Sequence, residues 1–177
     1  MTIYLRFFDY DKAFDYYCGV IEKMNQCTNR NNHVRIIAKP VLILSIITLI
    51  EKGKTINQFT YEEIEPIYKG IFGKYFIQAQ QQNLTNLHYP YYFLKTEMFW
   101  HLVWLNAEDK TDSPSRAWLE RNTKYAFIDQ ELWILLSHPT YRENLKTFII
   151  EKKIIKVFEN EKNKGIFKTL LQLLMII

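Results

Sequence analysis

Glycine and proline are scarce in this sequence, with five of each among 177 residues. Flexible linkers are rich in these residues, so a disordered linker does not fit the composition. No segment repeats at a regular spacing, which argues against a repeat solenoid. We therefore expect a single domain spanning residues 1–177, long enough to bury a sizeable core.

Cysteines and long apolar runs are also few. Cys18 and Cys27 are the only cysteines, they form no Cys-x-x-Cys motif, and no signal peptide precedes them. We expect free thiols that pack as small hydrophobic side chains in a cytoplasmic protein. The longest apolar run, Val41–Ile50, is shorter than the roughly 20 residues that cross a bilayer, so no membrane span is expected.

Recognisable catalytic motifs are missing as well. The chain has no glycine-rich phosphate loop, no dinucleotide fingerprint and no Gly-x-Ser-x-Gly motif. Glu151–Lys153 contains a Glu-x-Lys, but no acidic residue on a preceding strand accompanies it. We expect a non-catalytic protein without a cofactor or a metal, since metal-ligand spacing is absent from the four histidines, His33, His88, His101 and His138.

Aromatic residues are abundant, at 16% of the chain, and they gather in the segment His88–Leu105, HYPYYFLKTEMFWHLVWL. Core packing is the expected role of the rings from Phe93 to Trp104. Tyr89 and Pro90 allow two interpretations. They either anchor and open an edge strand, or they form a small apolar cup at the surface, to which two rigid rings are suited.

The expected fold class is α+β, mostly α, with a small antiparallel sheet in the middle of one helical domain. Two β-prone runs, Tyr91–Leu94 and Phe99–Trp104, predict a hairpin, and Lys124–Ile128 a third strand. Hydrophobic periodicity predicts helices elsewhere. They are expected over residues 11–27, 40–52, 61–82, 129–136 and 137–158, with a short helix from 113 and a tail helix within 159–177.

Start and stop signals support several of these helices. Pro40 is suited to the first position of a helix and Gly53 to the position after its end. Thr60 and Glu63 form a capping box. Ser113 precedes Pro114 as a cap would, and Asp129 and Ser137 stand before two further predicted helices.

Positive charge is in slight excess, with a formal net charge of +4. The segment Thr28–Lys39 holds Arg30, His33, Arg35 and Lys39 and no acidic residue. These side chains either form a solvated loop or contact phosphate, because the loop leads into a helix N-terminus that favours anions. A solvated helix face is the expected role of the basic residues further along the chain, Lys146, Lys152, Lys153 and Lys156.

Three segments, in order, resemble one known family. Ala38–Lys54 (AKPVLILSIITLIEKGK) resembles its helix HKPLLLLAxLDLIxxG, and Tyr89–Leu102 (YPYYFLKTEMFWHL) resembles its segment xPFFxLRSDGFWHL. Ser115–Ile150 (SRAWLERNTKYAFIDQELWILLSHPTYRENLKTFII) resembles LxxxVxYAxLDxELWxLLxDPxxRxxLRxxLL. The match covers residues 11–155. The family is the sulfur-binding domain of McrA-type HNH restriction endonucleases, which recognise phosphorothioate-modified DNA.

The resemblance implies binding of double-stranded, phosphorothioate-modified DNA in a bacterial restriction or defence system. In this family a shallow apolar cup holds the sulfur that replaces a phosphate oxygen, and basic and amide groups hold the flanking phosphates and bases. Carried over by position, Tyr89 and Pro90 form the cup, Lys39 lies beside it, and Arg30 and Arg35 approach the backbone. The full set of expected DNA- and sulfur-binding residues is Arg30, His33, Arg35, Lys39, His88, Tyr89, Pro90 and Lys95.

The sequence departs from the family pattern at three points. Ala38 stands where the family usually has His, which removes part of the cup wall, and Met98 stands where it usually has Gly. The HNH nuclease domain that commonly follows is absent. We therefore expect a stand-alone module, a truncated chain or a relative with altered specificity, in which cleavage needs a nuclease partner.

Two other functions stay open at this point. The first is a protein-interaction or scaffold module that keeps the fold without sulfur recognition, with the apolar segment Ile166–Ile177 as a docking or homodimer surface. The second is an enzyme whose site has no recognisable motif. We favour the DNA-binding module over both.

Overall fold

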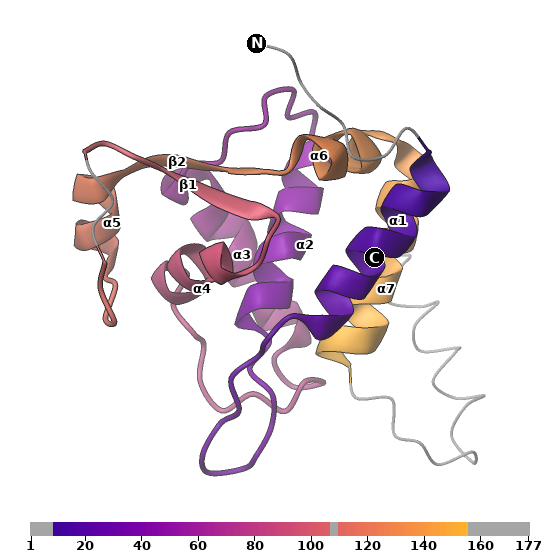
Figure 1. Cartoon of the computed structure of the whole chain (residues 1–177). Coiled ribbons are helices and arrows are strands. Elements are labelled where there is room, and N and C mark those ends of the chain that lie inside the picture. The colour runs from indigo at the N-terminus through magenta and orange to yellow at the C-terminus, as the bar shows by residue number, and fades with distance from the viewer. Residues whose placement is uncertain (1–8, 107–109, 156–177) are drawn as a thin grey trace, which may run out of the picture.

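The computed structural model describes residues 9–106 and 110–155 (Figure 1). The predicted tail helix within 159–177, the docking segment Ile166–Ile177 and Lys156 lie outside the described residues. Among the described residues, no helix combines the length and the apolar character needed to cross a membrane. In the same part of the chain, no three His, Cys, Asp or Glu side chains gather closely enough to hold a metal ion.

The fold is α+β and mostly α, with a two-stranded antiparallel sheet in the middle, as predicted. Seven α-helices and two strands form the described part of the chain, together with a 3-10 turn at Leu94–Thr96 and a π-helix at Ile150–Ile154. In chain order they are α1 Tyr10–Lys23, α2 Ala38–Glu51, α3 Tyr61–Tyr75, α4 His88–Phe93, β1 Trp100–Trp104, α5 Arg116–Asn122, β2 Thr123–Ile128, α6 Gln130–Ser137 and α7 Pro139–Ile149.

Helix α2 is the centre of the core. Figure 1 shows it in the middle of the molecule, with α1 and α7 on one side and the sheet and α5 on the other. Ten of its fourteen residues are buried, because apolar side chains surround it. It begins at Ala38, so Pro40 occupies its third position instead of the first. Gly53 follows its end at φ +93°, as predicted, a conformation that suits glycine.

Helix α3 begins as predicted and ends earlier. The Thr60 hydroxyl accepts a hydrogen bond from the backbone N–H of Glu63 at 3.4 Å, which satisfies one free donor of the first turn. The predicted end at Gln82 is wrong, because the helix stops at Tyr75. The following residues form turns, with Gln80 at φ +51°, and the Gln81 side chain bonds to the loop before α2.

The predicted hairpin between Tyr91–Leu94 and Phe99–Trp104 is wrong, because residues 88–93 form helix α4. Leu87 and Tyr91, one helical turn apart, are both buried, and the Tyr91 N–H donates to the Leu87 carbonyl at 2.9 Å. Pro90 lies in the first turn, where its missing N–H removes no helical hydrogen bond. Burial of the Tyr91 and Tyr92 rings in the core thus outweighs the β-propensity of the aromatic residues.

The sheet pairs β1 with β2, the strand predicted at residues 124–128. Trp100 faces Ile128 and Leu102 faces Ala126 in the antiparallel register. The Trp100 indole is buried and donates to the Tyr91 carbonyl at 2.9 Å, which fixes α4 against the sheet. Most rings from Phe93 to Trp104 pack inward as expected, with Phe99 and Trp100 about 1% exposed.

Three other helix boundaries and one side-chain cap differ from the predictions. Helix α1 ends at Lys23 instead of residue 27. The cap of α5 is Ser115 instead of Ser113, with its hydroxyl accepting from the Trp118 N–H at 3.2 Å. Asp129 precedes α6, but its carboxylate bonds to Tyr17 and His101 instead of the helix. Helix α7 ends at Ile149 and continues as the π-helix Ile150–Ile154.

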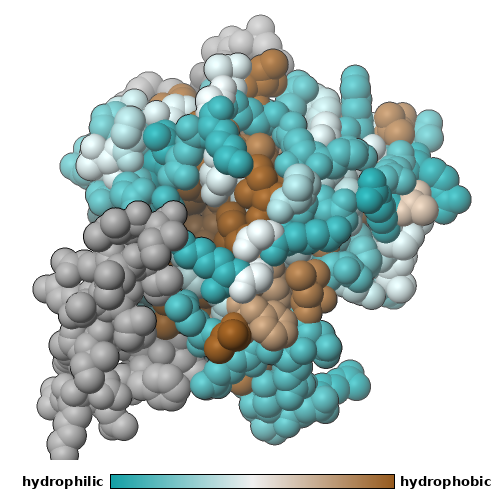
Figure 2. Space-filling model, turned by 180° about the vertical axis from the view of Figure 1, so that it is seen from behind, coloured by the Kyte–Doolittle hydropathy of each residue, from teal (hydrophilic) through white to brown (hydrophobic). Residues whose placement is uncertain are grey.

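Two expectations about single side chains are corrected. Cys27 is exposed, so only the partly buried Cys18 packs against the core. Lys153 is not solvated: it is 7% exposed, because the π-helix turns it inward toward the end of α1. The face of the molecule opposite to that in Figure 1 is mainly hydrophilic, and hydrophobic residues gather in its centre (Figure 2).

Candidate functional site

The loop between α1 and α2 borders two cavities. Its residues Thr28–Ile37, here called the basic loop, fold back on themselves through an antiparallel bridge between Thr28 and Arg35. Its backbone is closed by hydrogen bonds from Ile36 to Cys27 and from Asn29 to Val34, both 2.8 Å long. Cys27 and Ile36 line one cavity, while Thr28, Val34 and Arg35 line the other.

The first cavity, here called the apolar cup, has a volume of about 460 Å³. Helix α4 contributes Tyr89, Pro90 and Phe93 to its wall, and the start of α2 contributes Ala38 and Lys39. The remaining lining residues come from both ends of the α1–α2 connection, the segment before α4 and the 3-10 turn: Asn25, Gln26, Cys27, Ile36, Thr85 and Thr96.

Helical geometry explains why α4 presents its rings to the cup. Tyr89 and Phe93 are four residues apart, so they share one face of the helix, whereas on a strand Pro90 would point to the opposite side from both. Tyr89 is 41% exposed and its ring lies 4.4 Å from that of His88. Pro90 is buried against the core and only one side of it reaches the cup.

Ala38 forms part of the cup wall and is 6% exposed. Its methyl group is the smallest side chain among the lining residues. The wall of the cup is therefore apolar at this position.

Lys39 lies at the edge of the cup, but its charge is already paired. Its ammonium group donates to Glu97 Oε1 at 2.5 Å and to Thr96 Oγ1 at 3.3 Å. The side chains of Lys39 and Glu97 are 14% and 13% exposed. Because an ammonium group has three N–H donors, one remains for a further acceptor.

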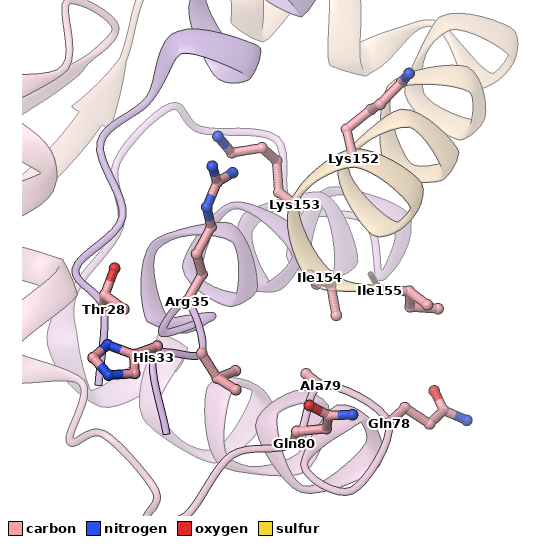
Figure 3. A pocket seen from close by; sticks show the side chains of 11 residues that line it. Thr28, His33, Arg35, Gln78, Ala79, Gln80, Lys152, Lys153, Ile154 and Ile155 are labelled. Atoms are coloured by element: carbon pink, nitrogen blue, oxygen red, sulfur yellow. The ribbon is translucent and has the colours of Figure 1, made fainter. Parts of the chain in front are cut away.

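The second cavity, here called the basic cavity, has a volume of about 350 Å³. Figure 3 shows three segments around it: the basic loop, the turn after α3 and the π-helix. The loop contributes Thr28, His33, Val34 and Arg35. The other two segments contribute Gln78, Ala79 and Gln80, and Lys152, Lys153, Ile154 and Ile155.

Amide side chains fasten the basic loop to the turn after α3. Asn29 Nδ2 donates to Gln82 Oε1, and Asn32 Nδ2 donates to the Gln80 carbonyl, both at 3.2 Å. Gln81 uses both ends of its amide: Nε2 donates to the Arg35 carbonyl at 3.0 Å and Oε1 accepts from the Ile37 N–H at 3.3 Å. These contacts hold the loop at the mouths of both cavities.

Lys153 and Gln26 hold the wall between the cavities. Lys153 Nζ donates to the carbonyls of Glu22 and Met24 at 2.9 and 3.1 Å, which caps the C-terminal end of α1. Burial lowers the pKa of Lys153, and the nearby charge of Arg35 lowers it further. Gln26 Nε2 donates to the carbonyls of Ile36 and Lys153. No pattern in the sequence marks either residue.

The predicted site residues thus divide into groups. Tyr89, Pro90 and Lys39 come together at the apolar cup, and His33 and Arg35 line the basic cavity. Arg30, His88 and Lys95 line neither cavity.

The three remaining residues have different surroundings. Arg30 is exposed on the basic loop. Burial lowers the pKa of His88, whose ring packs beside Tyr89. Lys95 lies over the rings of Tyr92 and Trp104, with its ammonium nitrogen 4.2 and 5.2 Å from the ring centres. Cation–π attraction therefore holds Lys95 at an aromatic cluster instead of the cup.

Sequence reasoning missed Phe93, Thr96 and Gln26 as lining residues of the cup. The spacing of Phe93 from Tyr89 would have revealed it, had residues 88–93 been recognised as a helix. Comparison with models of known protein families gives no match for this chain, and neither does comparison with curated protein sequences.

Proposed function

We propose that the protein is a non-catalytic DNA-binding module that recognises phosphorothioate-modified DNA in a restriction or defence system. One observation carries the proposal. Tyr89, Pro90 and Lys39, which the resemblance assigns to sulfur recognition from two distant parts of the sequence, line one cavity. Any cleavage of the DNA is then performed by a nuclease partner.

The chemistry of the apolar cup supports a preference for sulfur over oxygen. Its wall includes Tyr89, Pro90, Phe93, Ala38 and Ile36, which offer ring and methyl surface. A phosphate oxygen loses strong hydration when it enters such a wall, and the cup gives few hydrogen bonds in return. Sulfur is larger and less strongly hydrated, so it loses less and gains more dispersion contact.

The charge around the cup supports binding of the flanking phosphates. Lys39 keeps one free N–H at the edge, and Arg30 and Arg35 are exposed on the neighbouring basic loop. Contacts with phosphate release bound counterions, so the logarithm of the affinity falls linearly with the logarithm of salt concentration. In this proposal the cations bind the flanking phosphates with an affinity that depends on salt. Tyr89 and Pro90 contact the sulfur and provide the selectivity.

A competition binding assay tests the proposal. Two duplexes of identical sequence, one with a stereodefined phosphorothioate and one without, compete for the protein at fixed salt. We expect a preference for the modified duplex that Tyr89→Ala abolishes. Tyr10→Ala is the matched control, because Tyr10 is 43% exposed against 41% for Tyr89 and lines neither cavity. Equal affinity of the wild type for both duplexes refutes sulfur recognition.

A further inference from the structure

The basic cavity has two chemically different ends. In Figure 3 the charged ends of Arg35 and Lys153 lie close to each other at one end, while Lys152, from the preceding position of the π-helix, points away from them. Ile154, Ala79 and Gln80 lie at the opposite end. A ligand that fits both ends has an anionic group and a less polar body.

The end of the basic cavity that holds Arg35 and Lys153 is positively charged. No acidic residue lines the basic cavity. Arg35 and Lys152 are both exposed, and within the described residues neither forms an ion pair. By contrast, Lys39 and Lys146 are each paired with a glutamate. Like charges that line one cavity without an acid raise its positive potential and attract an anion.

The cavity is also firmly constructed. His33 and Gln80, at φ +54° and +51°, are the only non-glycine residues with positive φ in the described part of the chain, and both line it. Such a conformation is unfavourable for a residue that carries a side chain. The hydrogen bond from Asn32 to the Gln80 carbonyl joins the two strained segments. The strain therefore persists because surrounding contacts fix it.

We propose that the basic cavity binds a phosphate group carried by a ligand of mononucleotide size. Arg35 offers its guanidinium fork, which matches phosphate geometry, and the charges of Lys153 and of the more distant Lys152 add to the positive potential. The body of the ligand packs against Val34, Ala79 and Ile154. The volume of about 350 Å³ lies within the range of roughly 300–1,000 Å³ that small-molecule sites occupy.

The phosphate has two possible sources, a free nucleotide or a phosphodiester of bound DNA, and only the second rests on the proposed function. Isothermal titration with adenosine 5′-monophosphate, and with adenosine as the probe without phosphate, tests the first. Plain duplex binding tests the second. Both probes are applied to wild type, Arg35→Gln and Lys152→Gln.

Matched controls separate the cavity from general loss of charge. Arg30→Gln makes the same change on the same loop outside both cavities, and serves for the nucleotide probe. Lys124→Gln, an exposed residue of β2, serves for the duplex. Circular dichroism confirms that each variant is folded.

Two results support the inference. The ligand is a free nucleotide if the monophosphate binds and adenosine does not. In that case Arg35→Gln weakens binding of the monophosphate by about tenfold or more, and Arg30→Gln leaves it unchanged. If only the duplex responds to Arg35→Gln and Lys152→Gln, and Lys124→Gln has no effect, the ligand is a phosphodiester.

The inference is overturned if Arg35→Gln and Lys152→Gln bind both probes as the wild type does. Its failure can be told apart from failure of the proposed function. Sulfur preference is measured between two duplexes with Tyr89→Ala, while nucleotide binding is measured without DNA. Nucleotide binding without sulfur preference keeps this inference and refutes the function.

Discussion

Replacing Lys153 by methionine tests how the wall between the cavities is held. Methionine keeps the length and apolar character of the lysine stem but donates no hydrogen bond. The variant loses the two bonds that Lys153 Nζ makes to the carbonyls of Glu22 and Met24. It also loses a positive charge at the C-terminal end of α1, where the helix dipole favours one.

The expected loss of stability follows from opposing contributions. Hydrogen bonds that involve a charged group contribute about 1.5–3 kcal/mol each, and the helix-dipole contact about 0.3–1 kcal/mol. The variant regains part of this free energy, because methionine has no ammonium group to desolvate. Desolvation of that group is also what lowers the pKa of Lys153. We expect the free energy of unfolding to fall by about 2–3 kcal/mol.

Urea denaturation measures this difference, with Lys152→Met as the control. The control removes the same charge from the neighbouring position, but Lys152 is exposed, so its cost is within about 0.5 kcal/mol. Since Gln26 donates to the Lys153 carbonyl, we also expect Lys153→Met to weaken binding at the apolar cup. Equal stability of the two variants refutes a structural role for the Lys153 ammonium group.

Three further predictions concern other contacts. Thr60→Ala removes the cap of α3 and lowers the free energy of unfolding by about 1 kcal/mol in urea denaturation, while Thr60→Ser retains it. Glu97→Gln releases the charge of Lys39, so we expect plain duplex to bind more tightly. The slope of the logarithm of affinity against the logarithm of salt concentration should steepen by the equivalent of about one phosphate contact. A weaker complex contradicts this prediction. Burial lowers the pKa of His88 below 6.5 in the folded state, so protonation favours unfolding, and stability falls as pH drops below 6.5 toward the folded pKa. His88→Gln lessens this fall in thermal unfolding across pH 5–8, and an unchanged pH profile contradicts the assignment.

The parts of the fold with strong local signals were predictable. The apolar run between Pro40 and Gly53 indicated α2, and Gly53 and the Thr60–Glu63 pair indicated where neighbouring helices end and begin. Hairpin formation at residues 91–104 was a wrong prediction, because aromatic residues favour strands only when neighbouring strands bury them. In this protein, Tyr91 is buried by packing on the core and by the Trp100 indole, which no local pattern reveals.

The candidate site was predictable only where the resemblance reached it. Tyr89, Pro90 and Lys39 were named from the sequence and line one cavity. The burial of Lys153 depends on a contact 131 residues away in the chain, so no window of sequence contains it. Lys95 was among the expected DNA contacts, and the position of its ammonium group over the rings of Tyr92 and Trp104 could not be read from the sequence.

The amide contacts that fasten the basic loop have a consequence for measurements. Asn29, Asn32, Gln81 and Gln82 carry no charge, so their hydrogen bonds are neither screened by salt nor altered by titration between pH 5 and 9. The loop therefore keeps its shape throughout a salt titration. A change in affinity along that titration is therefore not caused by loosening of this loop, and its slope reports the number of phosphates contacted.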